Sequence, residues 1–132
     1  MQLKGLRSYF MKNHKTFSIQ ARANSFKYAF AGIKNFFSSQ HNSWIHLIAT
    51  TVVVFLAIIF HISWTEAIAL TFAVGFVWVS ELFNTGIEKI MDFISVEIDL
   101  RIKIIKDIAA AAVLVSAITA LIVGCIVFIP KI

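Results

Sequence analysis

Two long runs without a charged side chain, Trp44–Trp64 and Ile108–Ile129, limit what this chain can fold into more than any other feature. A transmembrane helix needs roughly 20 predominantly apolar residues, and both runs are long enough. A third stretch, Glu66–Asp92, is uncharged from Ala67 to Val79 and polar at its end. The sequence therefore predicts an all-α membrane protein with three transmembrane helices.

The connections between these spans differ in length. A very short turn is expected near residues 61–64, and a longer polar loop is expected from Phe93 to Lys106. On this reading the third span begins with Lys106 and Asp107, a cation and an anion that enter the membrane together.

Composition supports a membrane protein of one domain. The chain has 132 residues, of which 59 % are hydrophobic, a mean hydropathy of +0.84 and one proline. An ordinary soluble domain of this size is less apolar. The single cysteine, Cys125, cannot form a disulfide within the chain, and no zinc-binding spacing occurs.

The N-terminal segment is basic, and the first acidic residue of the chain is Glu66. Residues 1–24 are interpreted as a basic extension and residues 25–132 as the membrane domain. Apolar residues alternate with small and basic ones at the start of that domain, which predicts an amphipathic helix on the membrane surface: Phe26, Tyr28, Phe30, Ile33, Phe36 and Phe37. Because this segment adjoins the spans, a nucleic-acid partner is not expected.

The distribution of lysine and arginine predicts the orientation of the spans, because cytoplasmic flanks retain these residues. Seven basic residues precede the first span, and four more lie in or beside the second loop: Lys89, Arg101, Lys103 and Lys106. The short turn has none. The N-terminus and the second loop are therefore expected in the cytoplasm.

Four polar residues at the end of the second span are spaced by three, four and four positions: Glu81, Asn84, Glu88 and Asp92. On a helix they fall on one narrow face. Ionisable groups at membrane depth are costly unless they face a protein interior or a wet cavity, so they mark a candidate functional site.

Two interpretations of this polar face stay open on the residues alone. Glu81 and Glu88 could pair with Lys106 or Lys89 and only fix helix packing. Alternatively, carboxylates in a row suit Mg²⁺ holding a polyphosphate, and a buried carboxylate can take a proton from a hydroxyl. No Walker loop is present, so a nucleotide would need another binding device. His41 and His46 are expected to be solvated at the interface.

Three motifs carry a resemblance to a known family. "ELFNTGIEKIMD" (residues 81–92) and "KDIAAAAVLVSA" (106–117) resemble signatures of the small bacterial membrane lipid kinases, the prokaryotic diacylglycerol kinase and undecaprenol kinase family. "SFKYAFAGIKNFFSSQHNSWIH" (25–46) is similar to the surface helix that leads into the first span of that family.

The resemblance implies a homotrimeric bundle in the bacterial inner membrane, with active sites between protomers at the cytoplasmic face. The implied reaction transfers the γ-phosphoryl group of MgATP to the hydroxyl of undecaprenol or diacylglycerol. Glu81 matches the catalytic base, Asn84 the asparagine of the motif, and Glu88 a metal-binding carboxylate. The implied nucleotide contacts are Lys106, Asp107, Tyr28 and Glu97.

Gln40 departs from the family pattern, which has a second metal-binding glutamate at this position. An amide can still offer its carbonyl oxygen to Mg²⁺ but removes one negative charge. A catalytically weakened membrane scaffold of the same fold is therefore the alternative to a lipid kinase. A small transporter is disfavoured, because the acidic residues gather at one membrane face.

Overall fold

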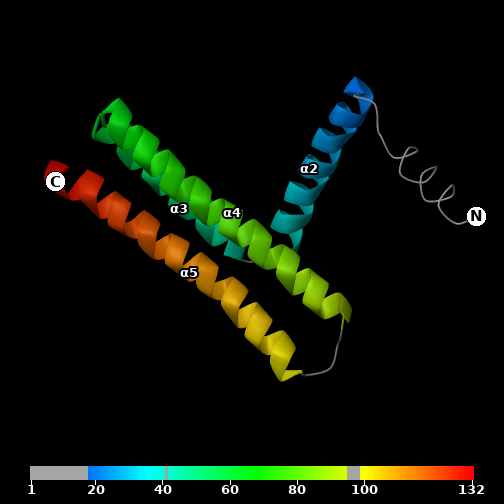
Figure 1. Ribbon diagram of the computed structural model, residues 1–132. Coiled ribbons are helices and arrows are strands. Elements are labelled where there is room, and N and C mark those ends of the chain that lie inside the picture. Colours follow the sequence, from blue (N-terminus) through cyan, green and yellow to red (C-terminus); the bar gives the residue numbers. More distant parts are fainter. Residues whose placement is uncertain (1–17, 41, 95–98) are drawn as a thin grey trace, which may run out of the picture. The chain divides into compact units, whose positions relative to one another are not determined.

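The structure, a computed structural model, describes residues 18–40, 42–94 and 99–132. Their regular structure is helical, which confirms the expected all-α class: α2 (Ile19–Ser39), α3 (Asn42–Ile59), α4 (Trp64–Ile94), α5 (Leu100–Phe128) and a 3₁₀ turn, η1 (Ile129–Lys131) (Figure 1). The chain divides into two compact units after Asn35. Residues 36–132 form the unit that contains α3, α4 and α5.

Three stretches of helix are long and apolar enough to cross a membrane: Asn42–Ile59, Trp64–Ile94 and Leu100–Lys131. Many of their large apolar side chains are exposed in the single chain, including Phe55, Phe72 and Leu121. Such faces are normal where the surroundings are lipid or a neighbouring helix. The prediction of three span-length helices is confirmed.

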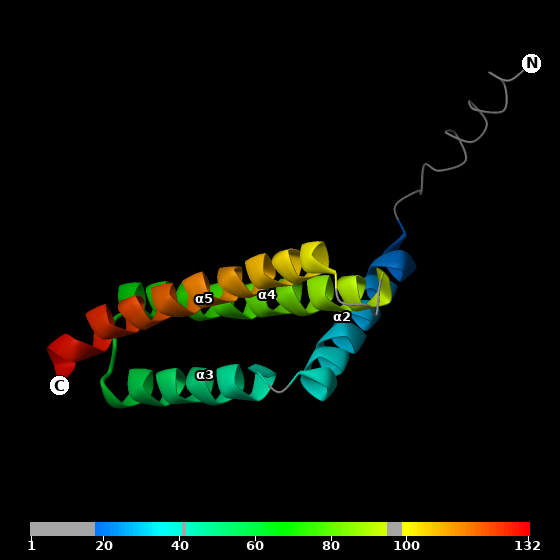
Figure 2. The same cartoon turned by 90° about the horizontal axis from the view of Figure 1, so that it is seen from below.

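Helices α4 and α5 lie side by side along much of their length, and α3 runs antiparallel to α4 (Figures 1 and 2). Their apolar core lies near the turn between α3 and α4. Leu70, Val127 and Phe128 are buried there, and the Phe60 and Phe128 rings have centroids 6.1 Å apart. This packing closes one end of the three-helix unit.

The turn between α3 and α4 is where the sequence predicted it, but Trp64 begins α4 instead of ending the first span. The reason is a capping box: the Ser63 backbone N–H donates to Glu66 Oε2 (2.7 Å), and the Glu66 N–H donates to Ser63 Oγ (3.4 Å). His61 in the turn has a positive φ of 47°. Lys131 Nζ lies 3.1 Å from Glu66 Oε1 and ties the end of the chain to this cap.

The predicted loop from Phe93 to Lys106 is wrong in length, because α4 continues to Ile94 and α5 already begins at Leu100. Asp99 is the N-cap of α5: its carboxylate accepts from the Arg101 backbone N–H at 2.7 Å. The pair Lys106–Asp107 consequently lies inside α5 and does not start it.

The segment predicted as a surface helix is helical from Ile19 to Ser39, while residues 1–17 lie outside the described ranges. Its position on a membrane surface stays a prediction. In the second unit, Phe36 is buried and its ring meets that of Trp78 edge-on, with centroids 6.1 Å apart. The end of α2 is thereby attached to α4 just before the polar face.

Candidate active site

The polar face of α4 points inward at its centre. Glu81 and Asn84 have exposed fractions of 3 % and 8 %, whereas Lys89 and Asp92 are exposed. Burying a carboxylate is costly unless polar partners compensate it. The partners of Glu81 and Glu88 therefore decide what this face can do.

Glu88 accepts hydrogen bonds from two amides. Asn84 Nδ2 donates to Glu88 Oε1 at 3.1 Å, and Gln40 Nε2 donates to Glu88 Oε2 at 3.3 Å. Gln40 is itself held by its backbone, because its N–H donates to the Phe36 carbonyl and its carbonyl accepts from Ser43 Oγ at 2.6 Å. The structure thus brings together the two residues that the sequence assigned to one metal site, Gln40 and Glu88.

Oxygen donors suited to Mg²⁺ are present at this point. Asn84 Oδ1 is buried and has no hydrogen-bond partner among the described residues. The amides of Asn84 and Gln40 can each present oxygen or nitrogen, since the two atoms exchange on a flip. In the described part of the chain no three His, Cys, Asp or Glu side chains form a metal-binding group, so amide oxygens would complete the shell around Glu88. The donor set fits a hard cation with one protein carboxylate.

Glu81 has a different partner. His46 Nε2 lies 3.1 Å from Glu81 Oε1, and their side chains are 19 % and 4 % exposed. The expectation that His46 is a solvated interfacial residue is wrong. Helices α3 and α4 are antiparallel, so a contact between residues 40 and 88 brings residues near 46 and 81 to the same level. From the sequence, the contact between His46 and Glu81 could have been predicted by placing Gln40 beside Glu88 and pairing the two helices antiparallel.

A third contact follows one turn further along the same two helices. Trp78 Nε1 donates to Thr50 Oγ1 at 3.0 Å, and Thr50 Oγ1 donates to the His46 carbonyl at 2.7 Å. The His46 and Trp78 rings lie edge-on with centroids 6.3 Å apart. Three successive polar contacts therefore fix the register of α3 against α4.

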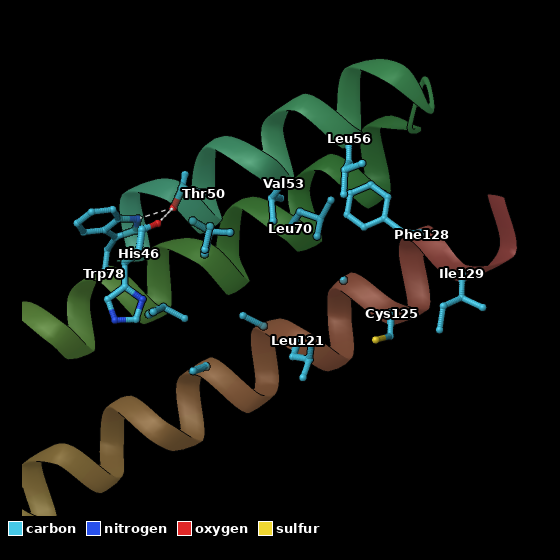
Figure 3. Close-up of a pocket in the computed structure, with 16 residues that line it drawn as sticks. His46, Thr50, Val53, Leu56, Leu70, Trp78, Leu121, Cys125, Phe128 and Ile129 are labelled. Carbon is cyan, nitrogen blue, oxygen red and sulfur yellow. Dashed lines mark hydrogen bonds between the residues drawn. The ribbon is translucent and has the colours of Figure 1, made fainter. Parts of the chain in front are cut away.

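A cavity of about 430 Å³ begins at His46 and continues between α3, α4 and α5. His46, Thr50 and Trp78 form its polar end, and the rest of its wall is almost wholly apolar (Figure 3). Leu56 and Phe128 lie towards the opposite end. The polar end of the cavity is thus the end at which His46, the hydrogen-bond partner of Glu81, lines the wall.

Of the four residues expected to contact nucleotide, the structure places one, Lys106, beside the polar face of α4. Lys106 Nζ donates to Asp92 Oδ1 at 2.8 Å, which joins α5 to the polar face one turn beyond Glu88. Asp107 accepts from Lys103 Nζ on its own helix at 2.6 Å and is exposed. Tyr28 is exposed in the other unit, and Glu97 lies outside the described residues.

The packing interpretation requires ion pairs of Glu81 and Glu88 with Lys106 or Lys89. Among the described residues, the two carboxylates are instead bonded to an imidazole and two amides, and Lys106 is bonded to Asp92. The structure does not show the arrangement on which that interpretation depended.

Comparison with known proteins gives one family. A family model described as prokaryotic diacylglycerol kinase matches residues 27–128. A Synechocystis sp. protein named diacylglycerol kinase is 36 % identical over 107 residues, which is 80 % of this chain and 61 % of that protein. A Bacillus subtilis protein named undecaprenol kinase is 32 % identical over 107 residues, covering 81 % of this chain and 87 % of that protein. The chain thus spans less than two thirds of the Synechocystis protein.

Proposed function

Because this chain belongs to the prokaryotic diacylglycerol kinase family, we propose that it transfers the γ-phosphoryl group of MgATP to the hydroxyl of a membrane lipid. One observation carries the proposal. A buried carboxylate, Glu81, is bonded to His46 at the polar end of an apolar cavity between helices of membrane-spanning length. A lipid alcohol has the matching shape, since it is polar at one end only.

Glu81 is the proposed base. Phosphoryl transfer depends mainly on positioning and on stabilising charge, and a carboxylate near the nucleophile can accept its proton. With an exposed fraction of 3 %, Glu81 is shielded from bulk water. The Glu81 carboxylate therefore accepts a proton from a group that enters the protein, such as the lipid hydroxyl.

Glu88, Asn84 and Gln40 are the proposed ligands of Mg²⁺. The ion, when bound, neutralises charge on the nucleotide phosphates. Asn84 Oδ1 supports this assignment, because it is a buried oxygen without a hydrogen-bond partner among the described residues. Asn84 would offer this Oδ1, and the Gln40 amide, which now donates to Glu88, would turn its oxygen towards the ion.

Lys106, Asp107, Tyr28 and Glu97 are the proposed nucleotide contacts, by resemblance to the family. Lys106 lies at the same end of the polar face as Glu88 and can offer a point charge to phosphate. Asp107 points to Lys103 on the outer side of α5. The family also implies a homotrimer with sites between protomers. In such a trimer the exposed Asp107 carboxylate would contact nucleotide in a site shared with a neighbouring protomer.

The lipid substrate is a single-hydroxyl alcohol whose chain enters the cavity. From His46 to Leu56 the helix rises about 15 Å, so the cavity extends well into the hydrocarbon layer. The two relatives are named for different lipids, diacylglycerol and undecaprenol. Both lipids share the hydroxyl and the apolar chain, and turnover of each decides between them.

The protein is proposed to lie in the inner membrane with its N-terminus and the α4–α5 connection in the cytoplasm. The basic residues that flank these segments support this orientation. It places the polar face of α4 on the side where ATP is available.

A catalytically weakened scaffold is the second candidate, and one contact favours it. Gln40 Nε2 donates to Glu88 Oε2, so an amide already satisfies the carboxylate that a metal would otherwise neutralise. ATP turnover with added lipid separates the two functions, because a scaffold would have none.

The test is a phosphorylation assay on the purified protein with labelled ATP, Mg²⁺ and each lipid, using wild type and Glu81→Gln. The amide keeps the shape of the side chain but cannot take the proton, so turnover should fall about 10²–10⁴-fold. Glu66→Gln, which changes a carboxylate at the other end of α4, is the matched control and should stay active. Wild-type-like turnover by Glu81→Gln would remove Glu81 as the base.

A further inference from the structure

His46 is hydrogen-bonded to the buried Glu81 and also lines the apolar cavity. Its imidazole is 19 % exposed and the Glu81 side chain 4 % exposed, so water competes little for their contact. The position of the ring therefore affects both the carboxylate and whatever enters the cavity.

The direction of this hydrogen bond follows from the chemistry of its two partners. An ionised carboxylate only accepts, so His46 Nε2 carries the proton and donates to Glu81 Oε1 when Glu81 is ionised. A neutral imidazole that donates through Nε2 has Nδ1 as its acceptor. His46 contacts Oε1 and not the second oxygen, Glu81 Oε2.

Contacts other than the one to Glu81 also hold His46 in place. Thr50 Oγ1 donates to the His46 carbonyl, and Trp78 Nε1 donates to Thr50 Oγ1, so the backbone at residue 46 is tied to α4. The Trp78 ring packs edge-on against the imidazole. A donor with so little freedom can fix the direction of a carboxylate that has three rotatable bonds of its own.

The geometry points to His46 as a positioning residue for Glu81: it occupies Oε1 and leaves Oε2 directed to the hydroxyl of a lipid whose chain lies in the cavity. This inference rests on the proposed function. In the step itself, the hydroxyl O–H bond breaks as its oxygen bonds to the γ-phosphorus, and Oε2 receives the proton. The bond from the γ-phosphorus to the bridging oxygen breaks, and ADP leaves with that electron pair.

A kinetic experiment separates positioning from simple packing. His46→Phe keeps a ring of similar volume without a donor, whereas His46→Gln replaces Nε2 by an amide N–H of similar reach. Because misplacing a reacting group by about 1 Å can cost 10²-fold, His46→Phe should lower kcat about 10- to 100-fold and leave the KM for MgATP unchanged. His46→Gln should restore most of the loss, and His61→Asn, at the exposed turn, should match wild type.

A second measurement tests the hydrogen bond without turnover. In nanodiscs, the side-chain ¹⁵N resonances of His46 should show Nε2 protonated and should move in Glu81→Leu, whereas those of His61 should not. Unchanged His46 resonances in Glu81→Leu would overturn the inference. Undiminished kcat in His46→Phe would overturn it as well, given an active wild type. Absence of wild-type turnover with every lipid would instead overturn the proposed function.

Discussion

Replacing Gln40 by glutamate puts a second carboxylate against Glu88. The amide nitrogen of Gln40 now lies 3.3 Å from Glu88 Oε2 and donates a hydrogen bond to it. In Gln40→Glu an anionic oxygen takes that place, and the donor is lost. The variant therefore converts an attractive contact into a repulsive one, unless a cation lies between the two groups.

The distance sets the size of the effect. Two unit charges 3.3 Å apart repel by about 5 kcal/mol at an effective dielectric constant of 20 and by about 1 kcal/mol in bulk water. Glu88 is only partly buried, and the new side chain can move away, so the lower part of this range applies. A bound dication removes the repulsion, and about 1.4 kcal/mol of relief corresponds to a tenfold change in affinity.

The assay is turnover against free Mg²⁺ at saturating ATP and lipid, together with thermal unfolding in EDTA and in Mg²⁺. Gln40→Glu should raise the apparent Mg²⁺ affinity about tenfold or more, lower the unfolding temperature in EDTA, and recover it with Mg²⁺. Ser39→Glu is the matched control, because it adds the same charge on a neighbouring exposed residue. Adding Glu88→Ala to Gln40→Glu should abolish most of the gain, since the two ligands would share one ion.

Two results would refute this reasoning. An unchanged Mg²⁺ curve for Gln40→Glu would place residue 40 outside the metal site. An equal gain in Ser39→Glu would show that general negative charge, and not a ligand opposite Glu88, attracts the ion.

Three further predictions concern the fold. The Arg101 side chain, together with the Arg101 backbone N–H, holds the pKa of Asp99 below its ordinary value. The stability that this cap contributes is therefore present above about pH 3.9 and is lost as the pH falls below it. Asp99→Asn keeps the cap but should remove this acid dependence from the thermal unfolding temperature. Trp78→Phe should lower the free energy of unfolding by about 1 kcal/mol through loss of the bond to Thr50, whereas Trp64→Phe, at a side chain 87 % exposed, should change it less. Protease added outside intact spheroplasts should spare an N-terminal tag and remove a C-terminal one, and cleavage of the N-terminal tag would refute the orientation.

Much of the fold could be predicted because the bilayer imposes simple requirements. Length and apolarity identify three spans without knowledge of any contact, and the structure contains three such helices. The errors lie at helix ends. Ser63 with Glu66 and Asp99 with Arg101 cap α4 and α5, and these local hydrogen bonds moved the boundaries by several residues. The sequence contains these capping residues, but boundaries predicted from the positions of charged residues do not coincide with them.

The sequence by itself determined that Glu81, Asn84 and Glu88 share one face of a helix, since 3.6 residues per turn leaves no other arrangement. What meets that face was decided by tertiary structure. The turn at Phe60–Ser63 and the packing of Val53 and Leu56 against the core around Leu70 fix the register of α3 against α4. This register sets Gln40 beside Glu88 and His46 beside Glu81. Helical periodicity fixes directions within one helix, but the pairing of two helices depends on contacts between residues distant in the chain. Only the folded chain could therefore show that a histidine expected to be solvated holds the buried carboxylate.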